Sequence, residues 1–370
     1  MKTSLQTFTR THLHTLTAVL LGLGIAACDS AIGGGDGLPA VAECSVPESA
    51  FQQGCNGKDC IPSLTNPDVV AASEVSYLDD DSRVIGIVLD GQPLAVPHGI
   101  LWWHEIANLD RADVQVAVTY CPLTGSSLAF DRAVIGGSTF GISGLLFQNN
   151  LTMYDRTSGE SLWPQMNRAA GCGPESGTAL PAVPILEMTW AGWRSLHPQT
   201  RVISNETGFD RNYRRYPYGD YESLGNRRLL DSRTAIDERR PPKERVLGIP
   251  SGEGGIAFPF GALDATGEPF QVVEETSGGE VVVFWDKERQ AAAAYQRALP
   301  DRTLSFTVQQ GQIMDAETGS VWRIDGLATA GPLEGTRLEP IADAYVAFWF
   351  AWAAFQPETR LWQGGEGETS

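Results

Sequence analysis

Short apolar segments separated by polar, glycine-containing turns recur along the chain from about Ile61 onward. Val84–Leu89 and Leu94–Val96 flank the turn Asp90-Gly-Gln92, which is the pattern of a β-hairpin. Val114–Tyr120 is rich enough in β-branched residues to form a mostly buried strand. Further short strands are expected at Leu128–Phe130, Ser138–Ile142, Leu151–Tyr154, Glu280–Trp285, Thr303–Val308 and Val321–Ile324. The chain is therefore predicted to be mainly β with some α (α+β), with a largely antiparallel body.

A three-residue spacing of large apolar side chains predicts one main helix in each half of the chain. These helices contain Trp190, Trp193 and Leu196 before Pro198, and Trp349, Trp352 and Phe355 before Pro357. Asp343 is expected to cap the second helix. Because the tryptophans recur in both halves, we interpret them as residues that pack helix against sheet rather than as ligands of a cofactor.

The order of turn glycines, prolines and tryptophans is also repeated, which indicates an internal duplication. Arg83-Val-Ile-Gly-Ile87 matches Arg245-Val-Leu-Gly-Ile249, and Ala117-Val-Thr-Tyr-Cys121 matches Val282-Val-Phe-Trp-Asp286. We expect a first repeat at 61–205, a crossover rich in arginine and tyrosine at 206–244, and a second repeat at 245–370. Phe260 takes the place of His98, His104 has no counterpart and Asp286 takes the place of Cys121, so the first repeat is the expected active copy and the second a scaffold.

The first residues have the pattern of a secretory signal. Lys2 and Arg10 precede the apolar run Leu16–Ile25, which is too short and too rich in glycine for a good membrane span. Ile25-Ala-Ala-Cys28 resembles the lipobox of bacterial lipoproteins, which implies a signal peptide at 1–27 and acylation of Cys28. Residues 28–60 then form a cysteine-containing tether, and the protein is expected in the cell envelope, facing the periplasm or the cell exterior.

The chain is acidic, with a formal net charge of −18. Removal of residues 1–27 takes away Lys2 and Arg10, and the remaining 25 basic and 45 acidic residues give −20. A surface of this charge repels nucleic acid, so the expected partners are the membrane, through the lipid anchor, and a small-molecule or protein redox partner.

Apart from Cys28, the chain contains five cysteines, an odd number for an oxidising compartment. We expect disulfides among Cys44, Cys55, Cys60 and Cys172, in an order that the spacing does not give. Cys121 is then the free thiol.

Cys121 ends a predicted strand and begins the turn Pro122-Leu-Thr-Gly-Ser126, a place where a side chain can face a pocket. A hydroxyl or an imidazolium near the sulfur would lower its pKa and make it reactive. An inert buried cysteine is the simpler interpretation of the same spacing. A third interpretation is a transition-metal site of His98, His104 and Cys121, which would suit copper if Met153 also contributed, and zinc or iron if Glu105 did.

Five segments closely resemble the bacterial and archaeal family known as domain of unknown function 3179. They are Trp103–Ile106, Thr119–Gly125, Phe140–Leu146, Met153–Arg156 and Ser161–Trp163. The resemblance extends from about Ile61 to Trp362 and brings no established activity. Some members of the family are associated with selenocysteine, which we place at the position of Cys121. This favours redox work there, because selenium is useful where reversible oxidation matters.

The motif residues of the family correspond to His104, Glu105, Cys121, Thr124, Asp155 and Trp163. We interpret Asp155 and Trp163 as scaffold, since Asp315 and Trp322 match them in the second repeat. In the redox hypothesis Cys121 is the nucleophile, His104 takes its proton, Glu105 orients the imidazole and Thr124 bonds to the sulfur, with no cofactor required. The alternatives are the metal site, and a non-catalytic envelope binding module.

Overall fold

The structure is a computed structural model that describes residues 44–111, 114–157, 159–251, 254–266, 270–276 and 278–364. The predicted signal peptide, Cys28 and the first part of the tether lie outside the described residues. No helix in the described ranges is both long and apolar enough to cross a membrane.

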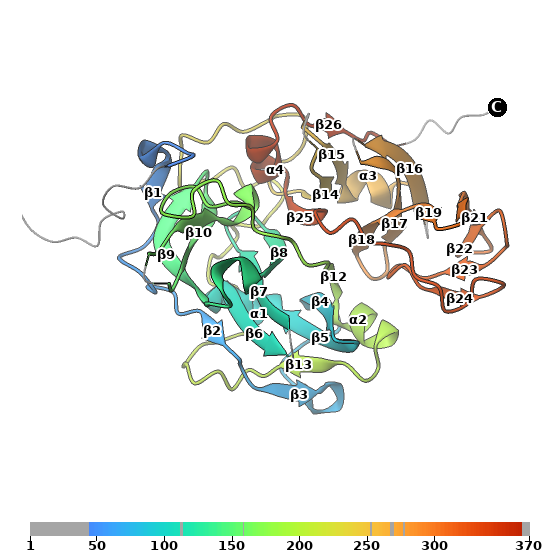
Figure 1. Cartoon of the computed structure of the whole chain (residues 1–370), viewed down its shortest axis with the longest axis horizontal. Coiled ribbons are helices and arrows are strands. Elements are labelled where there is room, and N and C mark those ends of the chain that lie inside the picture. Colours follow the sequence, from blue (N-terminus) through green and yellow to red (C-terminus); the bar gives the residue numbers. More distant parts are fainter. Residues whose placement is uncertain are drawn as a thin grey trace, which may run out of the picture. The chain divides into compact units, whose positions relative to one another are not determined.

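The described chain is mostly β with short helices, which confirms the predicted α+β class (Figure 1). The two halves contain sheets with the same order of four strands, and the sheet of the first half has one further strand at its edge. In the first half the sheet is β12 (Leu186–Thr189), β4 (Arg83–Leu89), β5 (Gln92–Pro97), β13 (Arg201–Ile203) and β3 (Val69–Ala71). In the second half it is β25 (Tyr345–Phe348), β14 (Arg245–Ile249), β15 (Ile256–Pro259) and β26 (Arg360–Leu361).

Strand direction and register agree between these two sheets. β4 and β5 form an antiparallel hairpin, as do β14 and β15. β5 also pairs in parallel with β13, and β15 pairs in parallel with β26. Val84 lies opposite Pro97, and Val246 lies opposite Pro259. A duplicated body, with Arg83 equivalent to Arg245, accounts for this agreement.

A second pair of sheets contains the strand that ends at Cys121 and its equivalent. The first half has β2 (Leu64–Thr65), β6 (Ile106–Arg111), β7 (Val114–Cys121) and β8 (Ser126–Asp131). The second half has β16 (Phe270–Thr276), β17 (Gly279–Asp286) and β18 (Ala291–Gln296). Cys121 pairs with Ser126, and Asp286 pairs with Ala291, so the two turns are equivalent.

The remaining strands form smaller sheets. They are β1 (Phe51–Gln53), β9 (Phe140–Phe147), β10 (Asn150–Asp155) and β11 (Leu162–Pro164) in the first half. In the second half they are β21 (Phe306–Gln309), β22 (Gln312–Asp315), β23 (Val321–Trp322) and β24 (Ala328–Ala330), with the hairpin of β19 (Ala298–Leu299) and β20 (Arg302–Thr303).

Each half contains the expected helix, α2 (Trp190–Leu196) or α4 (Trp349–Phe355), and also a second helix that was not predicted, α1 (His98–His104) or α3 (Phe260–Asp264). The short 3₁₀ segments are η1 (Glu48–Ala50), η2 (Ala72–Glu74), η3 (Arg132–Ile135) and η4 (Gln165–Asn167). The predicted cap Asp343 is wrong: α4 begins directly after the apolar strand β25, with Phe348 at the N-cap, and Asp343 pairs with Arg168.

The tryptophans of α2 and α4 pack against the sheets, as the repeat suggested. Trp193 and Trp352 are buried, and each lies directly over a glycine, Gly86 or Gly248, that leaves room for the indole. A methyl group on Gly248 would come within 2.1 Å of the Trp352 ring. The two glycines are therefore required by close packing.

The two halves also hold each other by equivalent bonds. The turn after β7 accepts a hydrogen bond from the second half, from Phe348 N to Thr124 O at 2.8 Å. The turn after β17 accepts one from the first half, from Thr189 N to Arg289 O at 3.0 Å. The loop that begins with Cys121 is thus fixed at the junction of the halves.

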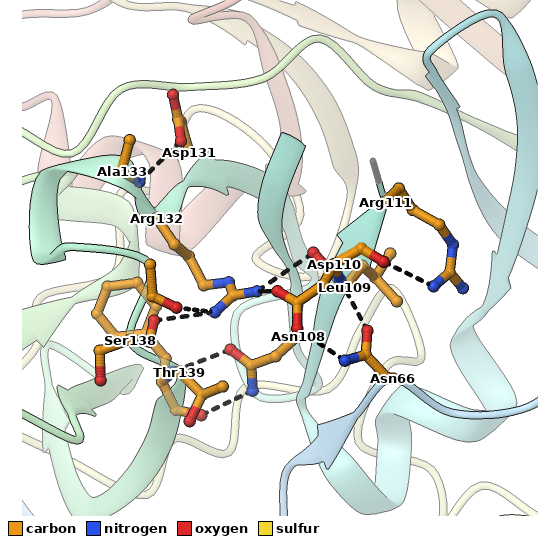
Figure 2. A network of polar contacts seen from close by, with 12 residues as sticks. Asn66, Asn108, Leu109, Asp110, Arg111, Asp131, Arg132, Ala133, Ser138 and Thr139 are labelled. Atoms are coloured by element: carbon orange, nitrogen blue, oxygen red, sulfur yellow. Dashed lines mark hydrogen bonds and ion pairs between the residues drawn. The ribbon is translucent and has the colours of Figure 1, made fainter. Parts of the chain in front are cut away.

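A buried polar network fixes strand β6, which leads away from α1 (Figure 2). Arg132 is fully buried and donates to Gly137 O at 2.6 Å, to Leu109 O at 3.2 Å and to the Asp110 carboxylate. Asn108 bonds both the N–H and the C=O of Phe140 at 2.9 Å. Since these bonds tie β6 to η3 and β9 through backbone groups, we interpret the network as structural.

The described cysteines form disulfides Cys44–Cys172 and Cys55–Cys60, and Cys121 is free. This agrees with the expected partition and supplies the connectivity that the sequence left open. Both bridges anchor the start of the body, where Phe51, Gln52 and Gln53 of β1 pair with β9.

Candidate functional site

Cys121 is the last residue of β7, and its side chain is fully buried. The Leu151 N–H donates to Sγ at 3.3 Å, and Sγ lies 3.9 Å from the carbonyl oxygen of Asn149. Burial and, to a smaller extent, the charge of Glu105 raise the pKa of the Cys121 thiol to about 11, against the opposing effect of bonds from Thr124 and Leu151. The thiol is therefore protonated at neutral pH in this closed state.

Glu105 is joined to the end of β7 through its backbone, since Tyr120 N donates to Glu105 O at 2.8 Å. It follows α1 with a φ of +55°, a left-handed conformation that is unfavourable for a residue with a Cβ. Its side chain is buried, and desolvation raises the pKa of the carboxyl to about 8. A carboxyl with this pKa can both accept and release a proton near neutral pH.

Tyr218 of the crossover packs with Tyr216 and Tyr221, at ring-centre distances of 5.5 and 6.4 Å. Burial raises the pKa of its phenol, and the charges of Glu105 and Cys121 contribute to the same shift. Thiol, carboxyl and phenol thus come from three parts of the chain: the end of β7, the end of α1 and the crossover.

Thr124 belongs to a fully buried network on the other side of the Cys121 turn. Its hydroxyl bonds to Ser126 Oγ at 2.8 Å and accepts from Asn150 Nδ2 at 3.0 Å. Ser126 and Asn150 both bond to Gln165 Oε1, at 2.6 and 2.8 Å. The network fixes the position of Thr124, which also lowers the pKa of the Cys121 thiol.

The crossover covers the Cys121 turn with tyrosines. Tyr216 donates to Pro122 O at 3.3 Å, and Tyr221 donates to Leu123 O at 3.0 Å. Lys243 lies 3.6 Å from the centre of the Tyr221 ring and 4.2 Å from that of Phe350. Burial lowers the pKa of Lys243 to about 7, with a further contribution from Arg228.

His104 makes its hydrogen bonds with Pro62 and Tyr213, not with Cys121. Its Nδ1 lies 2.8 Å from Pro62 O, a pure acceptor, so Nδ1 carries the proton and Nε2 accepts from the Tyr213 hydroxyl at 2.7 Å. Both ring nitrogens are thereby occupied, and the described residues show no bond from His104 to Glu105 or Cys121.

His98 belongs to a buried charged cluster between the two halves. Its Nε2 lies 3.7 Å from Glu187, and its ring lies 4.1 Å from that of Tyr120. Burial lowers the pKa of His98 to about 3, so the imidazole is neutral. Burial alone would raise the pKa of Glu187, but Arg83 at 2.7 Å, with other neighbouring charges, lowers it to about 2.

The proposed metal ligands His98, His104 and Cys121 therefore lie in three different surroundings. Among the described residues, one group of acidic, histidine or cysteine ligand atoms comes close enough to hold a metal, and it consists of Cys44, Glu48 and Cys172. Two of these are joined in a disulfide. The part of the chain that the structure describes gives no geometric support to a site of His98, His104 and Cys121.

Three features of this region did not emerge from the sequence. Glu187 bonds Arg83 and lies 3.9 Å from Arg245, so the equivalent arginines of the two halves meet at one carboxylate. The match of these arginines was visible in the repeat, but nothing marked Glu187 as their partner. Tyr218 and Asn149 were equally unmarked, because the folding of distant segments brings them to Cys121.

Together, the fold and site define a mostly β protein built from two equivalent halves, with a buried free thiol in the first half. A family model of proteins of unknown function, DUF3179, matches residues 58–359, which is most of the chain, and the protein belongs to this family. No curated protein and no solved structure matches the chain.

Proposed function

We propose that the protein is an envelope protein, attached to a membrane through a lipid on Cys28, whose body carries a thiol-based redox site at Cys121. The anchor is supported by the basic, apolar and small residues that precede Cys28. The redox site is supported by one observation above all: Cys121 is a free thiol next to Tyr120, whose N–H donates to the backbone of the buried Glu105 at 2.8 Å, in a chain whose other described cysteines are in disulfides.

The chemistry that suits this pair is reduction of a hydroperoxide. The sulfur attacks the terminal oxygen of R–O–O–H, the O–O bond breaks, and the products are a cysteine sulfenic acid and the alcohol R–OH. Glu105 takes the thiol proton as sulfur attacks and returns it to the departing oxygen. Thiol and hydroperoxide thus give sulfenic acid and alcohol, with no further reagent.

Glu105 has the proton-transfer role that we first gave to His104. His104 is committed to Pro62 and Tyr213, whereas the charge of Glu105 acts on the sulfur. Because the sulfur is fully buried, the reaction requires a motion that exposes it, and closure protects the thiol between reactions.

The experiment is mass spectrometry of the folded protein after mild peroxide and dimedone, with Cys121→Ser as the control. We expect a dimedone adduct on Cys121 in the wild type and none in the variant. An unmodified Cys121 in protein that is shown to be folded would contradict the redox proposal. The anchor is tested separately: Cys28→Ala should abolish labelling by palmitate in cells and release the protein from the membrane.

A non-catalytic binding module is the second candidate, and the burial and raised pKa of Cys121 favour it. In that case Cys121→Ser would leave the behaviour of the host unchanged, and the folded protein would resist peroxide at Cys121.

A further inference from the structure

A cavity of about 550 Å³ lies next to the turn between β9 and β10. Four parts of the chain line it: Ala50 of η1, Gln148 of that turn, the crossover residues Asp231 and 233–237, and residues 353, 354 and 357 at the end of α4. The volume is in the range of sites that bind small molecules.

Asn149 contacts both the sulfur and two residues that line this cavity. Its carbonyl oxygen lies 3.9 Å from Cys121 Sγ. Its side chain is held by cavity residues, with Nδ2 donating to Asp231 O at 3.0 Å and to Thr234 Oγ1 at 2.8 Å, while Asp231 N donates to Oδ1 at 2.6 Å. This single turn residue thus links the lining of the cavity to the thiol.

The turn between β9 and β10 has two central residues, Gln148 and Asn149, with positive φ at +50° and +64°. This is the usual geometry of a two-residue hairpin turn, and asparagine tolerates it better than glutamine does. The three bonds between Asn149 and the crossover residues Asp231 and Thr234 join this turn to the crossover.

The lining of the cavity favours an apolar occupant. Ala235 and Ile236 of the crossover face Ala353, Ala354 and Pro357, all of them aliphatic. Such a wall favours a hydrocarbon group, because burial of apolar surface is stabilising. The aliphatic side chains of the wall need no hydrogen-bond partner from the occupant.

The charges of the lining favour a neutral occupant. The one cation in the lining, Arg233, is tied to Asp231 at 2.9 Å and also donates to the carbonyl oxygens of Ser49 and Ala50. Asp237 is paired with Arg239 at 2.8 Å. The lining thus has two carboxylates and one fully engaged guanidinium, so it offers no free positive group to an anion.

We infer that this cavity is the substrate site of Cys121 and that it takes a neutral hydroperoxide with a hydrocarbon group, an alkyl or aryl hydroperoxide. This inference rests on the proposed redox function. The hydrocarbon group occupies the cavity, and the peroxide end reaches Sγ past Asn149. Sulfur is oxidised to the sulfenic acid, the O–O bond breaks, and the hydroperoxide leaves as its alcohol.

The experiment measures the rate of sulfenic acid formation at Cys121 with hydrogen peroxide and with cumene hydroperoxide. Ala354→Trp fills the cavity from α4, and Ala235→Trp fills it from the crossover in case the first variant does not fold. Ala330→Trp, at an exposed position of β24, is the matched control. We expect the rate with cumene hydroperoxide to fall about tenfold or more in the filled variants, and the rate with hydrogen peroxide to change little. A difference of one small group in an apolar pocket changes rates by about 10 to 200-fold.

Unchanged rates with cumene hydroperoxide in the filled variants, or equal slowing with both peroxides, would overturn this inference and leave the redox function standing. A wild-type Cys121 that reacts with neither peroxide would overturn the redox function itself. The two failures are therefore distinguishable.

Discussion

The buried carboxyl beside the thiol makes a quantitative prediction for Glu105→Gln. The pKa of Glu105 is about 8 in the folded protein against an ordinary 4.5, because burial disfavours the charged form. The difference of about 3.5 pKa units, at about 1.4 kcal/mol each, corresponds to a free energy on the order of 5 kcal/mol.

The sign follows from the direction of the shift. Between pH 4.5 and 8 the folded state keeps a proton that the unfolded state has lost, so the wild type loses stability as the pH rises through this window. Glutamine resembles the protonated carboxyl and does not titrate. The unfolding free energy of Glu105→Gln minus that of the wild type should therefore increase with pH and become constant above about pH 8.

Urea unfolding, followed by tryptophan fluorescence from pH 4.5 to 9 with both disulfides intact, measures this difference. Asp315→Asn is the control. Burial alone would raise the pKa of Asp315, but bonds from Trp322, Thr318 and Ser320 lower it below its ordinary 3.8, so its effect should not vary between pH 5 and 9. A flat difference for Glu105→Gln would refute the desolvated carboxyl and with it the proton-transfer role.

Three further changes test the fold and the charged cluster. Gly248→Ala should destabilise the protein by about 1 to 3 kcal/mol, because the new methyl overlaps the Trp352 ring, whereas Gly225→Ala, with open space around it, should have little effect in the same urea assay. Cys172→Ser opens a bridge that spans 128 residues and should cost about 2 to 5 kcal/mol, measured as a lower Tm; an unchanged Tm would contradict it. Glu187→Gln removes the buried carboxylate that binds Arg83 and lies near Arg245, which also pairs with Glu222, and it should cost about 3 to 5 kcal/mol in urea unfolding at pH 7; a neutral result would show that water replaces the carboxylate at these half-buried arginines.

The sequence predicted the elements with strong local signals. The hairpin of β4 and β5, the helix of Trp190 and Trp193 and the equivalent helix of the second half were all expected, since each has a clear periodicity or turn. The helix α1 was missed, because its apolar residues Ile100, Leu101, Trp102 and Trp103 are consecutive and do not show the three-residue spacing that marked α2 and α4. Asp343 was wrongly predicted as a cap because the apolar run that follows it begins with strand β25, not with the helix. The sequence pattern does not distinguish the two.

The candidate site was predictable only in part. The odd number of cysteines identified Cys121 as the free thiol, and the comparison with Asp286 located it at the end of a strand. Its surroundings depend on contacts over long sequence separations, such as those of Asn149 with Asp231 and Thr234, which no local pattern encodes. The same limit made His104 look like the partner of the thiol, although Tyr213 and Pro62 bind it.

The most direct test of the proposed redox site is the pH dependence of Cys121 oxidation by a hydroperoxide, in the wild type and in Glu105→Gln. The rate in the wild type should rise with an inflection near pH 8, where Glu105 becomes able to accept the thiol proton, and this inflection should vanish in the variant. Identical profiles in the two proteins, or no oxidation of Cys121 at any pH at which the protein is folded, would contradict the proposal.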